Sequence, residues 1–289
     1  MRDRARYRRS AAPIAALAVV SLALPGLCFA QGFGRGRGRG PVGPPPVPEK
    51  AAPIDLTGYW VSVVTEDWLY RMVTPPKGDF ASVPLNAEGR RVGNAWDPEK
   101  DIATSEQCKS YGAPAIMRVP GRLHITWADD HTLKIETGAG TQTRLFHFAT
   151  AREPAGGEPL LTLASGAASG PPDWQGYSEA QWDLATGGRG PGGGFPGVGG
   201  RGPARGGSLE VVTTHLRPGY LRKNGVPYSA NTVLTEYYDR TNETNGDSWL
   251  IVTTIVDDPQ YLTGQFITST NFKKEADGSK WSASPCTAK

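Results

Sequence analysis

The sequence predicts an all-β fold, an antiparallel barrel of about eight to ten strands with one or two short helices. Two observations carry this prediction. Runs rich in Val, Ile, Thr, Tyr, Phe and Trp alternate with turn residues such as Gly138-Ala139-Gly140, and helix signals occur only within residues 86–112. Short runs joined by tight turns pair with their neighbours along the chain, so we expect an antiparallel meander.

The individual elements follow from local patterns. Asn86 can cap a helix over 87–96, and Ser105 can cap a short turn that ends at Gly112. We expect the excursion 67–120, which contains both, to cover one mouth of the barrel or to pack on its side. Nine runs are expected to be strands: 58–64, 122–127, 132–137, 142–148, 176–182, 208–217, 232–239, 248–256 and 265–272.

The first thirty residues predict a secretory signal peptide. Five arginines precede an apolar run at 11–24, and Cys28-Phe29-Ala30 supplies a cleavage site. The run is shorter than the roughly 20 apolar residues that a membrane-spanning helix needs. A twin-arginine signal at Arg8-Arg9 and lipidation of Cys28 are alternatives that fit less well. We therefore expect a secreted or periplasmic protein with no membrane span in its mature part.

Two tracts have the composition of disordered segments. Residues 31–52 contain six Gly and five Pro, and residues 187–207 contain twelve Gly and three Pro. Neither tract has enough apolar surface to offset the entropy of folding. We expect the first to be a linker and the second an insertion within a single barrel domain at 53–289. A boundary between two domains is the alternative, but each flank has too few strands to close a barrel.

The charge of the chain is unevenly distributed. The total is +3, of which +4 lies in the first thirty residues and +3 in each of the tracts 31–52 and 187–207, which leaves −7 for the rest. An acidic domain repels phosphate, so we expect no nucleic-acid partner.

The two cysteines that remain after export predict a disulfide. Cys108 and Cys286 form an even pair in an oxidising compartment, and two free thiols are the alternative. The bond would tie the C-terminus to the first third of the domain.

The segment Gly58-Tyr59-Trp60 resembles the G-x-W that opens lipocalins and other calycins. The resemblance implies a calycin-like barrel with a central ligand cavity, in which Trp60 plugs one end and a basic residue of the last strand, Lys273 or Lys274, packs across it. The chain from 56 to 286 also resembles a group of uncharacterised secreted bacterial proteins, through EDWLYRMVTPPKGD, GTQTRLFHF and RPGYLRKNGVPYSAN.

Polar side chains on apolar strands predict a pocket inside the barrel. Alternation places Arg144, His124, His215, Glu236 and Tyr238 on faces that could line a cavity. A histidine and a carboxylate can exchange protons near neutral pH, which makes the two histidines and the glutamate the catalytic candidates. The alternative is that each residue decorates the solvent face of its strand.

Two loops mix aromatic and basic residues, at 66–79 and 217–231. Together they could hold an anionic or aromatic ligand through cation–π and charge-assisted contacts, or they could be structural crossovers. The candidate ligand-binding residues are Trp68, Tyr70, Arg71, Tyr220, Arg222 and Tyr228 from the loops, with Arg144 and Tyr238 from the strands.

These patterns favour a secreted, lipocalin-like protein that binds a small apolar or aromatic molecule. A barrel enzyme that transfers protons on a lipid, terpenoid or aromatic substrate, such as an isomerase, cyclase or hydratase, is one alternative, and a cell-surface interaction protein is another. We expect no metal and no cofactor, because the four histidines lack zinc-site spacing and no Walker or Rossmann glycine pattern follows a strand. The sequence does not predict the oligomeric state.

Overall fold

The computed structural model describes residues 47–148, 170–184 and 207–289. The predicted signal peptide at 1–30, all but the end of the predicted linker and nearly all of the predicted insertion lie outside the described residues. The end of the linker forms helix α1 (Pro48–Ala51), whose Pro48 carbonyl accepts a hydrogen bond from the Trp182 indole at 3.0 Å. The last residues of the predicted linker therefore pack on the barrel.

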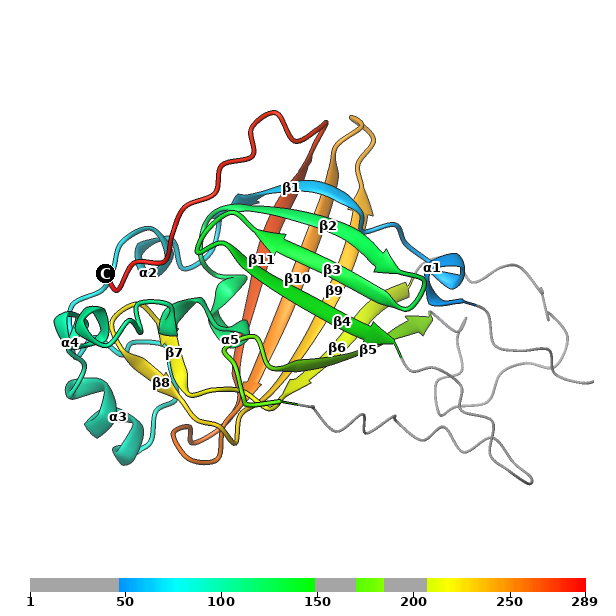
Figure 1. Ribbon diagram of the computed structural model, residues 1–289. Coiled ribbons are helices and arrows are strands. Elements are labelled where there is room, and N and C mark those ends of the chain that lie inside the picture. The colour runs from blue at the N-terminus through cyan, green and yellow to red at the C-terminus, as the bar shows by residue number, and fades with distance from the viewer. Residues whose placement is uncertain (1–46, 149–169, 185–206) are drawn as a thin grey trace, which may run out of the picture. The chain divides into compact units, whose positions relative to one another are not determined.

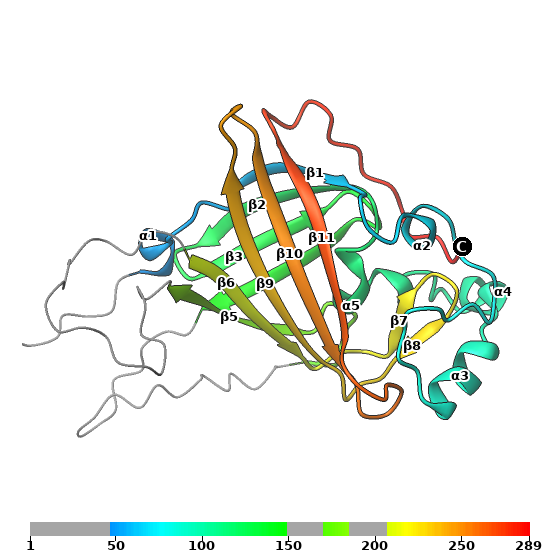
Figure 2. The same cartoon turned by 180° about the vertical axis from the view of Figure 1, so that it is seen from behind.

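Nine strands form a closed barrel in the order β1-β11-β10-β9-β6-β5-β4-β3-β2, which confirms the all-β prediction (Figures 1 and 2). Closure gives each of these nine strands a hydrogen-bonded neighbour on both sides. The strands are β1 (Gly58–Val63), β2 (Arg122–Asp129), β3 (Thr132–Thr137), β4 (Gln142–Phe148), β5 (Tyr177–Leu184), β6 (Gly207–Thr214), β9 (Val233–Asn242), β10 (Ser248–Asp257) and β11 (Phe266–Glu275).

The barrel differs from the expected meander at one strand pair. Strands β4 and β5 run parallel, with Phe146 opposite Ser178 and Phe148 opposite Ala180. Parallel neighbours need a connection of a dozen or more residues, because the chain must return to the same end of the sheet. The segment 149–176 between β4 and β5 is long enough for this, whereas short turns connect β2 to β3 and β3 to β4.

Side chains of alternate strand residues fill the barrel. The interior cluster includes Trp60, Leu123, Ile125, Leu133, Ile135, Phe146, Leu209, Val211, Leu250, Val252 and Phe272, none more than 3% exposed. Burying this apolar surface is the main stabilising term of the fold.

A basic residue of the last strand packs against the ring of Trp60. Lys274 is its register partner on β11, and the Lys274 ammonium lies 5.2 Å from the Trp60 ring centroid and donates to the Thr57 carbonyl at 2.9 Å. Lys273 instead pairs with Asp247 at 2.8 Å. Of the two lysines considered from the sequence, Lys274 therefore makes the contact with the tryptophan.

An accessory layer covers one end of the barrel, opposite the end where α1 lies (Figures 1 and 2). It packs on a second apolar cluster that includes Phe80, Leu85, Leu221, Tyr228, Leu262 and Phe266. Its elements are α2 (Trp68–Met72), α3 (Ala87–Asn94), α4 (Pro98–Ala103), the 3₁₀ helix η1 (Lys109–Tyr111), α5 (Ala113–Ile116) and the hairpin of β7 (Gly219–Arg222) and β8 (Val226–Tyr228).

The capping predictions for these helices have mixed outcomes. Asn86 caps α3 as predicted, because its side chain accepts a hydrogen bond from the Gly89 amide at 2.8 Å. Ser105 does not cap the turn that ends at Gly112: it has a left-handed φ of 59°, and the N-cap residue of η1 is Cys108, which makes no side-chain capping bond. Asp97 caps α4, which the sequence did not predict as a separate helix. Helices α2 and α5 lie outside the predicted range, since five and four residues are too few to show a helical period.

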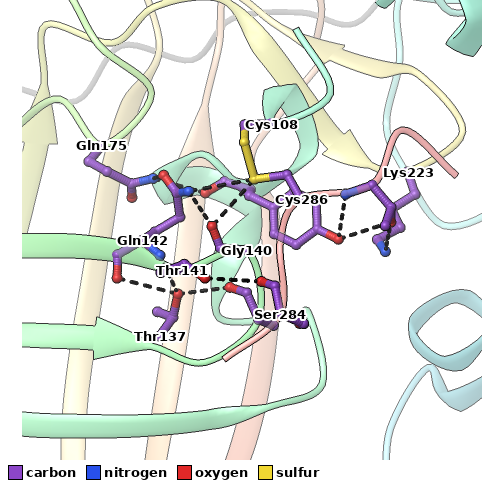
Figure 3. Close-up of a disulfide and its surroundings, with 12 residues drawn as sticks. Cys108, Thr137, Gly140, Thr141, Gln142, Gln175, Lys223, Ser284 and Cys286 are labelled. Atoms are coloured by element: carbon purple, nitrogen blue, oxygen red, sulfur yellow. Dashed lines mark hydrogen bonds between the residues drawn. A yellow bond between two sulfur atoms is a disulfide. The ribbon is translucent and has the colours of Figure 1, made fainter. Parts of the chain in front are cut away.

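The predicted disulfide is present and joins η1 to the C-terminal tail (Figure 3). Cys108 and Cys286 have Cα atoms 5.1 Å apart and are 178 residues apart in sequence. Beside the bond, the Ser284 amide donates to the Gly138 carbonyl at 2.8 Å, and the Thr141 hydroxyl donates to the Ser284 carbonyl at 3.1 Å. The tail is therefore held both by the accessory layer and by the turn between β3 and β4.

Replacing both cysteines with serine should lower the free energy of unfolding by roughly 4 kcal/mol, because the bond closes a very long loop of the unfolded chain. The measurement is guanidinium denaturation of the variant beside the oxidised and the reduced wild-type protein. The reduced wild type should match the variant. A variant that unfolds at the same denaturant concentration as the oxidised wild type would show that the bond contributes nothing.

Candidate functional site

A buried ion pair occupies the interior of the barrel. The Arg144 guanidinium on β4 donates to both carboxylate oxygens of Glu236 on β9, at 2.9 and 2.6 Å, and neither side chain is exposed. The Tyr238 hydroxyl donates to Glu236 at 3.2 Å and lies 3.3 Å from Arg144, which also donates to Thr213 at 3.3 Å. Three of the five predicted pocket residues therefore meet inside the barrel.

The charges and the burial of this cluster shift the pKa values of Arg144 and Tyr238. Desolvation opposes the charge on Arg144, but the carboxylate of Glu236 raises the pKa of the guanidinium above its ordinary value. Burial, and then the negative charge of Glu236, raise the pKa of Tyr238 well above its ordinary range. Arg144 and Glu236 thus pair with each other inside the barrel, although the Nε of Arg144 has no partner among the described residues.

The two histidines predicted to join this cluster do not, and that part of the prediction is wrong. His124 lies on the outer face of β2, stacked on Tyr59 at 4.1 Å with its Nδ1 3.1 Å from Glu136. Its neighbours Leu123 and Ile125 take the interior positions, so alternation turns His124 outward. His215 follows the end of β6, has a φ of 57°, and its Nε2 lies 2.9 Å from the Gly170 carbonyl.

A hollow of about 410 Å³ lies at the end of the barrel that the accessory layer covers. We call it the mouth hollow. The two aromatic and basic loops of the sequence meet here, since Tyr70 and Arg71 line it from one loop and Arg222 from the other. Lys223 of the second loop also lines it, and the sequence did not predict that Arg118 and the tail residues Ser284, Pro285 and Thr287 would complete its wall.

Arg71 has a structural role in the hollow. Its side chain is fully buried and donates to the Arg118 carbonyl at 2.9 Å, to the Ser62 hydroxyl at 3.1 Å and to the Glu66 carboxylate. Burial lowers the pKa of Arg71 despite the favourable charge of Glu66, and the positive charge of Arg118 lowers it further. Arg71 therefore holds α2 in place and contributes positive charge.

Arg118 and Arg222 carry donors that have no acceptor within the described part of the chain. Arg118 is 5% exposed; its Nη2 donates to Asp67 at 3.0 Å, and its Nη1 has no partner. Arg222 is 4% exposed; its Nη1 donates to the Ala81 carbonyl at 2.7 Å, and its Nε and Nη2 have no partner. Burial, and then the charge of Arg118, lower the pKa of Arg222. Such unpaired donors cost about 1–3 kcal/mol each unless an acceptor arrives.

Aromatic rings support these cations. The Arg222 guanidinium lies 4.3 Å from the Tyr70 ring centroid, and the Lys223 ammonium lies 5.0 Å from that of Tyr111. Burial opposes ionisation of Tyr111, but Lys223 lowers its pKa below the ordinary value. The Tyr111 hydroxyl accepts from the Thr287 amide at 3.3 Å, so it fastens the C-terminal tail to the wall of the hollow.

Other predicted ligand-binding residues lie elsewhere. Trp68 is 63% exposed on the outer side of α2. The Tyr220 hydroxyl donates to Asp101 at 2.9 Å and ties β7 to α4, and burial raises the pKa of Tyr220 to about 12. Tyr228 is buried in the accessory core, and Tyr238 lies in the barrel. One feature of the sequence could have pointed to Arg118 as a site residue: it is the only charged residue within the apolar run 113–120.

The described residues were predicted to contain neither a metal site nor a membrane span. No group of three or more His, Cys, Asp or Glu side chains there is arranged to hold a metal ion. Within the same residues, no helix has the length and apolar content to cross a bilayer.

Comparison of the chain with protein-family models, with curated proteins and with solved structures gives no significant match. The lipocalin resemblance at Gly58-Tyr59-Trp60 therefore stays a prediction. What the fold and the site define is a closed β-barrel with an arginine-lined hollow at one mouth.

Substituting Arg144→Met should lower the free energy of unfolding by about 3–5 kcal/mol, because Glu236 would be left buried without its partner. The double variant Arg144→Met/Glu236→Leu should recover most of that loss, since both charges are gone. Urea denaturation of the three proteins gives the comparison. A single variant as stable as the wild type would contradict the role of the pair.

Proposed function

We propose that the protein is an exported small-molecule-binding protein of the lipocalin-like type, and that its ligand has an anionic group and an apolar or aromatic body. The ligand occupies the mouth hollow. The single observation that carries the proposal is the set of unpartnered donors on Arg118 and Arg222, which are both more than nine-tenths buried and line the hollow.

An anion is the partner that these donors favour. Guanidinium groups stay charged at every physiological pH and match carboxylate or phosphate oxygens in geometry. Glu66 and Asp67 pair with Arg71 and Arg118, whereas Arg222 forms no ion pair within the described residues. A bound carboxylate or phosphate would satisfy the Nε and Nη2 donors of Arg222 and the Nη1 donor of Arg118.

The rest of the wall suits an apolar body. Tyr70, Tyr111, Val119, Leu221 and Pro285 line the hollow beside the cations. Its volume lies within the roughly 300–1,000 Å³ typical of small-molecule sites. The barrel interior, where a lipocalin would hold its ligand, is filled by side chains around Arg144, so the hollow is the better supported place.

The lining favours binding over proton transfer. The described residues that line the hollow include no His, Asp, Glu or Cys. An arginine cannot serve as a general base near neutral pH, because it stays protonated there. The proton-transfer alternative based on His124, His215 and Glu236 has no assembled site, since the histidines lie outside the barrel and Glu236 inside it.

The test is calorimetric titration with dodecanoate and with dodecan-1-ol, which share the apolar chain and differ in charge. We expect the wild type to bind the carboxylate more tightly than the alcohol. Arg222→Met should weaken dodecanoate binding roughly tenfold or more, since a hydrogen bond to a charged group contributes about 1.5–3 kcal/mol.

The matched control is Arg91→Met, which removes the same charge from an exposed side chain on α3. It should leave dodecanoate affinity unchanged. Circular dichroism verifies that both variants fold. Equal affinity for the two probes, or unchanged affinity in Arg222→Met, would rule out an anion site in the hollow.

A further inference from the structure

Helix α2 presents an apolar face to solvent. Trp68, Leu69, Met72 and Val73 are 63%, 50%, 60% and 58% exposed. The spacing of one, three and one residues places these side chains on one side of the helix and its C-cap. We call these four residues the α2 patch. They are half of the eight large apolar residues that are exposed in the described part of the chain.

The opposite side of α2 is anchored. Arg71 is fully buried and bonds to Ser62 on β1 and to the Arg118 carbonyl, and Tyr70 lies against the Arg222 guanidinium. The patch therefore sits on a fixed element with its apolar face turned outward, which is the reverse of an ordinary surface helix.

The patch continues into the mouth hollow. Met72 and Val73 belong to the patch and also line the hollow beside Arg71 and Arg222. Lys77, four residues beyond Val73, is exposed. The carboxylates nearest the helix, Glu66 and Asp67, are paired with Arg71 and Arg118. The apolar α2 patch thus adjoins the arginine-lined mouth hollow.

The size of the patch limits what can cover it. Each of the four side chains is half to two-thirds exposed, and a large apolar side chain has a surface of roughly 150–250 Å². Together they expose on the order of 400 Å² of apolar surface. A stable protein–protein interface buries about 800 Å² on each partner. Binding to a bilayer requires less buried area. A few apolar side chains that enter its outer 5–10 Å contribute to binding, and attraction between basic residues and anionic lipids adds to it.

We propose that the α2 patch docks the protein on a lipid surface that carries anionic headgroups. Trp68 and Leu69 enter the boundary between headgroups and acyl chains, a depth at which tryptophan is favoured. The mouth hollow then opens beside the headgroups. This docking goes beyond ligand binding in the hollow and does not depend on it.

The experiment is co-sedimentation of the full mature protein with phosphatidylcholine vesicles and with vesicles of equal parts phosphatidylcholine and phosphatidylglycerol. The wild type should bind the anionic vesicles, and binding should weaken at high salt. Trp68→Ser/Leu69→Ser should bind them at least about tenfold more weakly, because it removes two apolar anchors.

The control is Val233→Ser/Ile267→Ser, which replaces two exposed apolar residues on β9 and β11, 41% and 57% exposed, and should bind like the wild type. Every protein tested keeps the basic tracts at 31–52 and 187–207, so any binding by those tracts is common to all.

Three results would overturn the proposal: no sedimentation of the wild type, equal binding to neutral and anionic vesicles, or equal binding by the Trp68→Ser/Leu69→Ser variant. Sedimentation equilibrium adds a fourth. A wild-type dimer that this variant converts to a monomer would make the patch a self-interface. Titration of the same variant with dodecanoate in solution reports on the hollow alone, so the two proposals fail separately.

Discussion

Closure of the barrel is the constraint on which the rest of the structure depends. Strand β1 pairs with β2 on one side and with β11 on the other, so each of the nine barrel strands has two neighbours and the barrel interior is enclosed along its sides. Polar groups enclosed there must find partners among themselves, as Arg144 and Glu236 do. A site that opens into the barrel can therefore exchange molecules with solvent only at an end of the barrel.

The accessory layer and the C-terminal tail build such a site at one end. The Cys108–Cys286 bond holds the tail beside η1, and the tail supplies Pro285 and Thr287 to the wall of the mouth hollow. The hollow is thus assembled from segments that are far apart in sequence. Its shape depends on a covalent bond as well as on packing, which fits an exported protein.

The buried arginines Arg144 and Arg222 differ in the partners that surround them. Arg144 donates to both oxygens of a carboxylate at its side and to a threonine, so its charge is neutralised inside the fold. Arg222 is almost as buried, but it forms no ion pair among the described residues, and two of its three nitrogens have no acceptor there, compared with one nitrogen, Nε, of Arg144. The same residue type is a core element in one place and a candidate anion site in the other, because only the first has a buried carboxylate beside it.

The strands, the barrel class and the cysteine pair could be predicted from the sequence, because periodicity, β-branched composition and the number of cysteines beyond the first thirty residues are read directly from the chain. The sequence also indicated that the loops with Tyr70, Arg71 and Arg222 could bind a ligand. Three features became clear only in the tertiary structure. These are the parallel pairing of β4 with β5, the outward position of His124, and the presence of Arg118 and Arg222 together in the wall of the mouth hollow. Each of these depends on which segments meet across the barrel mouth or on which face of a strand is buried, and contacts between residues distant in sequence set both.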